Sequence, residues 1–149
     1  MKEIGKVIET FSADKNSSGL PRPLVKKLEF IKGFGIKDDK FAGKDEEKAV
    51  MIVGLKAYTI AKENNIDLEL GSFGENILMD FDPHEYKIGS IFEIQGVKLE
   101  ITQNCTICNH LAVFGKQLPI LVKDHRGLYC KILTSGIIEK ENLIYTKDQ

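Results

Sequence analysis

The apolar segments of this chain are short, and turn-forming residues separate them. The clearest pair is residues 88–94 and 97–102, which the turn Gln95-Gly96 joins; the second segment alternates apolar and polar residues. Alternation is typical of a strand with one buried face, and such a turn is typical of a hairpin. Further strands are predicted at residues 4–11, 24–31, 49–53, 129–133 and 143–146, and at the end of 71–80. The pattern predicts a mainly β fold with inserted helices, in the α+β class.

Two segments have the spacing of helices. In residues 54–64 apolar side chains can face a core while charged ones face water, and in residues 105–115 apolar residues recur at helical spacing. The polar and glycine-rich stretches 12–19 and 33–43 predict loops. The charged residues 44–48 predict a solvated surface turn.

Composition excludes several classes of protein. The chain has 149 residues, 21 of them basic and 22 acidic, so its net charge is −1 and no global positive field attracts nucleic acid or anionic lipid. The start of the chain lacks the apolar core of a signal peptide, and no apolar run approaches the roughly 20 residues of a membrane span. We expect a single cytoplasmic domain over residues 1–149, with reduced thiols. No P-loop, dinucleotide fingerprint or nucleophile elbow is present.

Two of the three cysteines, Cys105 and Cys108, lie one helical turn apart after a predicted strand. At a helix N-terminus the dipole and free N–H groups stabilise a thiolate, which favours a nucleophile or a sulfur carrier. The spacing also suits two zinc ligands, with Cys130 and one histidine completing a tetrahedral set, the candidates being His84, His110 and His125. A dithiol switch and simple burial are the remaining interpretations. For Cys130, inside an apolar strand, we predict burial in the core.

Polar residues in two loops are candidates for ligand contacts. Asp39 can cap backbone N–H groups of its own loop or bind a ligand, and capping is the simpler interpretation. Glu75 and Asn76 follow glycines that let a ligand approach the backbone closely. Each interpretation depends on the pocket that the fold provides.

Three basic residues are candidates for an anion site. Arg22, Lys40 and Arg126 would clamp an anion if the fold brought them to one pocket, because arginine suits bidentate contacts with phosphate. Their wide separation in the sequence leaves that condition open.

Four motifs in this order resemble those of the MOSC domain family, named after the C-terminal domain of molybdenum cofactor sulfurases. A glycine and aspartate loop corresponds to residues 35–43, a Gly-x-Phe-Gly-Glu-Asn-Leu motif to residues 71–77, and a Thr-x-Pro-Arg-x-Pro-Cys segment to residues 102–108. The closing pattern of the family is similar to residues 125–129 and 134–138. The resemblance covers residues 5–145.

The chain departs from the family pattern at several positions. Asp38 stands in place of a glycine, Lys40 in place of an arginine, and Cys105 where an arginine is common. Glu141-Asn142 replaces the usual Gly-Asp. Lysine supplies charge without the bidentate fork of arginine.

The resemblance implies a closed or partly open β-barrel like the pyruvate kinase barrel domain. It implies binding of the molybdenum cofactor, or carriage of sulfur as a persulfide, with Cys108 as the catalytic thiol or a molybdenum ligand. A cysteine desulfurase that holds pyridoxal phosphate, or another molybdenum-enzyme maturation protein, is the implied partner. The implied cofactor-binding residues are Asp39, Lys40, Gly74, Glu75, Asn76 and Arg126.

Two other functions remain open. Some members of the family reduce N-hydroxylated compounds with a bound cofactor, which would make this chain part of a molybdenum-dependent reductase. The non-enzymatic alternative is a structural or zinc-stabilised binding domain that pairs with a maturation partner, and the extra Cys105 near histidines motivates it.

Overall fold

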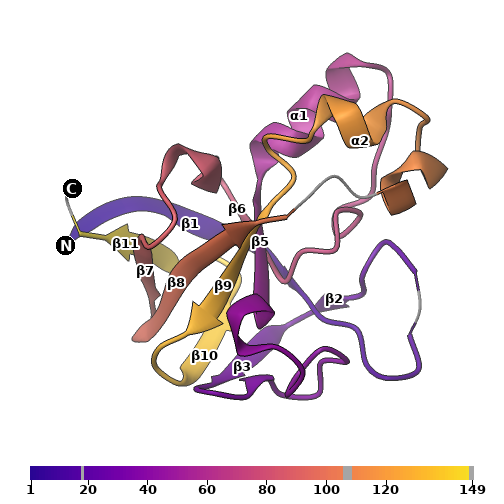
Figure 1. The fold of residues 1–149 in the computed structure, drawn as a ribbon. Coiled ribbons are helices and arrows are strands. Elements are labelled where there is room, and N and C mark those ends of the chain that lie inside the picture. The colour runs from indigo at the N-terminus through magenta and orange to yellow at the C-terminus, as the bar shows by residue number, and fades with distance from the viewer. Residues whose placement is uncertain (18, 106–108, 148–149) are drawn as a thin grey trace.

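The computed structural model of this protein describes residues 1–17, 19–105 and 109–147, and its fold is a β-barrel with short helices at one end (Figure 1). The described strands are β1 (Lys2–Phe11), β2 (Leu24–Val25), β3 (Lys27–Ile31), β4 (Gly35–Ile36), β5 (Val50–Gly54), β6 (Ile77–Met79), β7 (Ile91–Ile94), β8 (Val97–Asn104), β9 (Leu128–Ile132), β10 (Gly136–Glu139) and β11 (Leu143–Thr146). The described helices are α1 (Leu55–Glu63) and α2 (Leu118–Leu121), with the 3₁₀ turns η1 (Glu46–Lys48), η2 (Pro83–Glu85) and η3 (Asn109–Val113).

Seven of the described strands close the barrel. They follow the order β11, β7, β8, β9, β5, β6, β1, and β1 pairs again with β11. The pair β5 and β6 is parallel, whereas the other barrel pairs are antiparallel. Outside the ring, β2 pairs with β1, and β3, β4 and β10 form a small second sheet. Closure removes the unpaired edges of a sheet, and it confirms the β-barrel that the resemblance implied.

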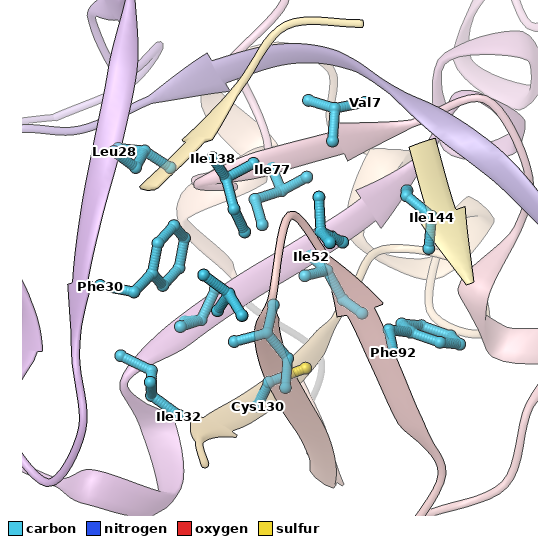
Figure 2. Packing of buried hydrophobic residues seen from close by; sticks show 14 of the residues in the cluster. Val7, Leu28, Phe30, Ile52, Ile77, Phe92, Cys130, Ile132, Ile138 and Ile144 are labelled. Carbon is cyan, nitrogen blue, oxygen red and sulfur yellow. The ribbon is translucent and has the colours of Figure 1, made fainter. Parts of the chain in front are cut away.

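The interior of the barrel is filled by alternate side chains of its strands. On β8, Val97, Leu99 and Ile101 are fully buried. Figure 2 shows the same packing for residues from the other strands and from the second sheet, among them Val7, Phe30, Ile52, Phe92, Cys130 and Ile138. The prediction that Cys130 is a core residue is therefore confirmed.

The strand β5 is apolar throughout because both of its faces are covered. Val50 and Ile52 pack in the barrel interior, whereas Met51 and Val53 pack in a second apolar cluster with residues of α1 and α2. Figure 1 shows these two helices side by side at one end of the barrel. A strand buried on both faces has no polar alternation to display.

The hairpin and the helix 54–64 are confirmed, two other predictions need correction, and one strand was missed. Residues 24–31 form two strands on either side of Lys26, because β2 pairs with β1 outside the closed ring and β3 joins the second sheet. The helix predicted over 105–115 is not found in the described part of that range: Cys105 has no helical backbone, and the described helical residues form the 3₁₀ turn η3. The strand β10 was not predicted, because only one of its four side chains is buried and the apolar signal is weak.

No helix in the described part of the chain is long and apolar enough to cross a membrane.

Candidate functional site

A cavity of about 1050 Å³ lies where several loops meet the outer face of β5 and β9. Its wall comes from residues 19–22 after β1, residues 39–48 before β5, the loop before β6, and the segments around Cys105 and Arg126. The cavity is large enough for a small-molecule ligand. Sequence segments that are far apart therefore build one site.

The cavity brings together most of the site residues predicted from the sequence. Asp39, Lys40, Gly74, Asn76 and Arg126 line it, and the third member of the basic set, Arg22, lines it as well. Arg22, Lys40 and Arg126 therefore share one pocket, as an anion clamp made of these three residues requires.

Two predicted site residues are not part of that wall. Glu75 is fully buried behind it. Cys108 lies outside the described residues, although Cys105 and His110 on either side of residues 106–108 both line the cavity.

Arg22 and Arg126 converge on Gly74. A Cβ atom added to Gly74 would lie 3.8 Å from Nε of Arg22 and 4.0 Å from Nη2 of Arg126. Burial lowers the pKa of Arg22, and Arg126 acts in the same direction, while Asp39 and Glu75 oppose the shift. Two buried cations at one point favour an anion between them.

Asp39 holds the loops that carry these cations. Its Oδ1 accepts hydrogen bonds from Ser12 Oγ at 2.7 Å and the Ala13 amide at 3.3 Å, and it forms an ion pair with Arg22 Nη1 at 3.3 Å. Its Oδ2 accepts from the Phe41 amide at 3.1 Å. The Asp39 carboxylate therefore caps backbone amides, which is the simpler of its two interpretations.

Cations surround the exposed ring of Phe41 at the cavity wall. Arg22, Lys40 and Lys44 lie 5.0, 5.3 and 5.8 Å from the ring centroid. Lys40 also donates to the Ser17 carbonyl at 3.2 Å. The charged segment 44–48 is exposed, as predicted. Lys44 and Lys48 also line the cavity, and the prediction of a surface turn did not include that role.

Asn76 joins two barrel strands with its amide group. Its Oδ1 accepts from the Met51 amide at 3.0 Å, and its Nδ2 donates to the Phe11 carbonyl at 3.1 Å. Both polar atoms of the side chain are therefore used in linking β1 and β5 at the cavity wall.

Glu75 supports the loop before β6 from inside the protein. Its Oε2 accepts a hydrogen bond of 2.5 Å from the Tyr58 hydroxyl, which in turn accepts from the Gly71 amide at 2.9 Å. Oε1 has no partner among the described residues. Burial raises the pKa of Glu75, and burial together with Glu75 raises the pKa of Tyr58.

Among the described residues, Cys105 is the cysteine that lines the cavity. Its side chain is 8% exposed, its Sγ accepts a contact from Nη1 of Arg126, and it lies 3.8 Å from the Tyr129 hydroxyl. Tyr129 also lines the cavity and was not predicted as a site residue. The alternation of β9 is the signal that would have found it, because Tyr129 lies between the inward residues Leu128 and Cys130 and so faces outward.

Two of the proposed zinc ligands, Cys105 and Cys130, lie in separate apolar clusters. Cys130 packs inside the barrel, where burial raises its pKa, while Cys105 packs in the cluster outside it. His125 pairs with Asp82, with Nδ1 and Oδ2 at 2.6 Å, and its ring contacts that of His84. Across residues 1–17, 19–105 and 109–147, no three histidine, cysteine or acidic side chains form a metal-binding group.

The family model described as MOSC domain matches residues 38–145. No curated protein sequence matches the chain.

Solved structures resemble the fold closely at low sequence identity. The YuaD protein from Bacillus subtilis is 18% identical, with a TM-score of 0.76 over 94% of this chain and 93% of that one. YiiM from Geobacillus stearothermophilus is 16% identical, with a TM-score of 0.70 over 99% and 75% of the two chains. YiiM from Escherichia coli is 13% identical, with a TM-score of 0.71 over 97% and 70%. At such identities the likeness concerns the fold alone.

Proposed function

This chain belongs to the MOSC domain family, and we propose that its cavity binds the molybdenum cofactor through the cofactor's phosphate while Cys108 serves as the functional thiol. The family is associated with molybdenum cofactor binding or sulfurase-related function. The observation that carries the proposal is the convergence of Arg22 and Arg126 on Gly74 inside a cavity of about 1050 Å³.

The residues of this cavity fit a phosphate-bearing ligand. Arg126 is 7% exposed and its Nε has no partner among the residues that the structure describes. Gly74 itself adds no side chain beside the two guanidinium groups, and Leu20 Cδ2 lies 3.6 Å from the place of its missing Cβ. Lys40 adds a further positive charge at the wall. An oxyanion held there would receive charge-assisted hydrogen bonds.

The remaining predicted residues would act as supports. Asp39 orients Arg22 through their ion pair, and Asn76 fixes the strands below the cavity. Glu75 holds the loop of Gly71 and Gly74 through Tyr58. We assign these residues to positioning of the cationic groups and not to direct cofactor contacts.

The sulfur-carrier part of the proposal concerns Cys108. A cysteine desulfurase with pyridoxal phosphate would present a persulfide, and the Cys108 thiolate would attack its terminal sulfur. The new S–S bond forms on Cys108, the old S–S bond breaks, and the desulfurase cysteine leaves as a thiolate. Cys105 and His110 flank residues 106–108 in the sequence and both line the cavity, which supports a role for Cys108 at this site. The cofactor, when bound, would supply the metal centre that receives the sulfur.

Two measurements test the two parts separately. For binding, protein produced in a host that makes the cofactor is analysed for molybdenum and oxidised pterin per chain. Native protein should contain both, Arg22→Gln should lose most of each, and Lys62→Gln, at an exposed position of α1 outside the cavity lining, should retain them. Equal contents in all three proteins would refute the binding site.

For sulfur transfer, the purified protein is mixed with a desulfurase and cysteine. Intact mass should then reveal one added sulfur on native protein and none on Cys108→Ser. An unmodified native thiol, under conditions that load a control carrier, would refute transfer without affecting cofactor binding.

A further inference from the structure

Cys105 lies at the wall of the cavity in a defined position. It follows the end of β8, and its amide donates to the Gly127 carbonyl at 3.1 Å. The side chain is 8% exposed and lines the cavity. Cys130, by contrast, is fully buried inside the barrel. The two described thiols therefore differ in access, and only Cys105 can meet a ligand in the cavity.

The surroundings of Cys105 are cationic. Nη1 of Arg126 contacts its sulfur, and Nη2 of the same guanidinium donates to the Phe73 carbonyl at 3.1 Å, which holds the group in place. Arg126 Nε is buried without a partner in the described part of the chain. Arg22 and Lys48 line the same cavity. A sulfur anion and an anionic ligand would both find fixed positive charge here.

We propose that Cys105 is a second reactive thiol of this cavity, which exchanges with small anionic disulfides independently of Cys108. The Cys105 thiol gives its proton to solvent, and the thiolate attacks one sulfur of the disulfide. A new S–S bond joins Cys105 to that half of the ligand, the ligand's own S–S bond breaks, and the other half leaves as a thiolate with the electron pair. No outside oxidant is required, because the disulfide is itself the oxidant.

Charge should decide which disulfides react. Among the described residues, five cationic side chains line the cavity against the two carboxylates of Asp39 and Asp45, and such an excess of one sign of charge in a cleft raises the local concentration of ligands of the opposite sign. Arg126, whose guanidinium contacts Cys105, also lines the cavity, so its positive charge lies close to any ligand that reaches the thiol. Neutral disulfides of similar size gain neither effect, so the cavity selects anionic ones.

The test uses Cys108→Ser protein, which keeps Cys105 and Cys130 and does not depend on persulfide loading at Cys108. The probes are dithiobis(nitrobenzoate), a dianion, and dithiodipyridine, a neutral disulfide. We expect one released thiolate per chain with either probe, mapped to Cys105 by peptide mass. Relative to free cysteine, the anionic probe should be favoured over the neutral one by about tenfold or more, and high salt should reduce that preference.

A protein with both Cys105 and Cys108 changed to serine is the control, since its only thiol is the buried Cys130. It should react only after denaturation. Circular dichroism of each variant before labelling establishes that the fold is intact. Reaction of Cys105 only in denaturant, or equal preference for the two probes in folded protein, would overturn the proposal.

Discussion

Arg22 and Arg126 approach the same side of Gly74, with Nε of the first and Nη2 of the second 3.8 and 4.0 Å from the place that a Cβ would take. Arg22 comes from the loop after β1, and Arg126 directly precedes Gly127 and β9. Like charges that are buried together cost free energy unless an anion or carboxylate compensates them. Asp39 compensates Arg22 through an ion pair, whereas Nε of Arg126 has no partner within the described ranges.

Replacing Gly74 by alanine should empty the site without unfolding the protein. The residue has a φ of +80°, so an L side chain costs about 1–2 kcal/mol there. Its methyl group would also occupy the space beside both guanidinium groups. Gly89→Ala is the matched control, because its φ is +95° and no described atom lies within 4 Å of the added Cβ. Both variants should lose similar stability in urea, but only Gly74→Ala should lose bound molybdenum. Equal metal contents would contradict this role of Gly74.

Replacing Asp39 by asparagine should destabilise the fold. The change leaves the buried Arg22 without its ion-pair partner, which costs about 3 kcal/mol for a buried pair. The surface pair Lys6–Glu141, 3.1 Å between Nζ and Oε2, provides the control. Glu141→Gln should cost less than about 1 kcal/mol. Urea unfolding of both variants measures the difference, and similar losses would show that Asp39 does not stabilise a buried charge.

Removing the hydroxyl of Tyr58 should loosen the loop before β6. In Tyr58→Phe, Glu75 loses its donor and the Gly71 amide loses its acceptor. Groups left buried without partners cost about 1–3 kcal/mol. Tyr145→Phe is a suitable control, since that hydroxyl has no hydrogen bond to any residue in the described part of the chain. Hydrogen exchange at Gly71 and Gly74 should accelerate only in Tyr58→Phe; unchanged exchange would contradict the supporting role.

His84 should make the protein less stable in mild acid. Burial lowers the pKa of His84 and His125 acts in the same direction, while Asp82 and Asp124 oppose the shift. The unfolded chain therefore takes up a proton at a higher pH, near the ordinary value of about 6.5, than the folded protein does. The contribution of His84 to the free energy of unfolding is complete above the pKa of the unfolded chain. It falls as the pH drops from there toward the lower pKa of His84 in the folded protein. His84→Gln should flatten the dependence of the urea midpoint between neutral and mildly acidic pH, and an unchanged slope would contradict this.

Local patterns were enough to find several elements. The hairpin of β7 and β8 has register partners Ile94 and Val97 around a turn whose residues Gln95 and Gly96 have φ of 50° and 79°. Such a turn depends on neighbouring residues alone, and so does the alternation of β8. The core position of Cys130 follows from the same kind of pattern.

Other elements depended on distant contacts. The division of residues 24–31 at Lys26 reflects the two sheets that receive β2 and β3, and the weak strand β10 exists because β3 pairs with it. No periodicity in the segment itself carries that information. The 3₁₀ turn η3 in place of a longer helix is a further example.

The sequence by itself determined the fold class, the family and the set of candidate basic residues, because strand alternation, turns and ordered motifs are properties of short segments. The tertiary structure alone decided that Arg22, Lys40 and Arg126 share a cavity, that Glu75 lies behind its wall, and that Cys105 contacts Arg126. These relationships arise when the pairing of β1 with β11 and of β5 with β9 closes the barrel. Closure joins residues from distant parts of the chain, and local sequence preferences do not encode such distances.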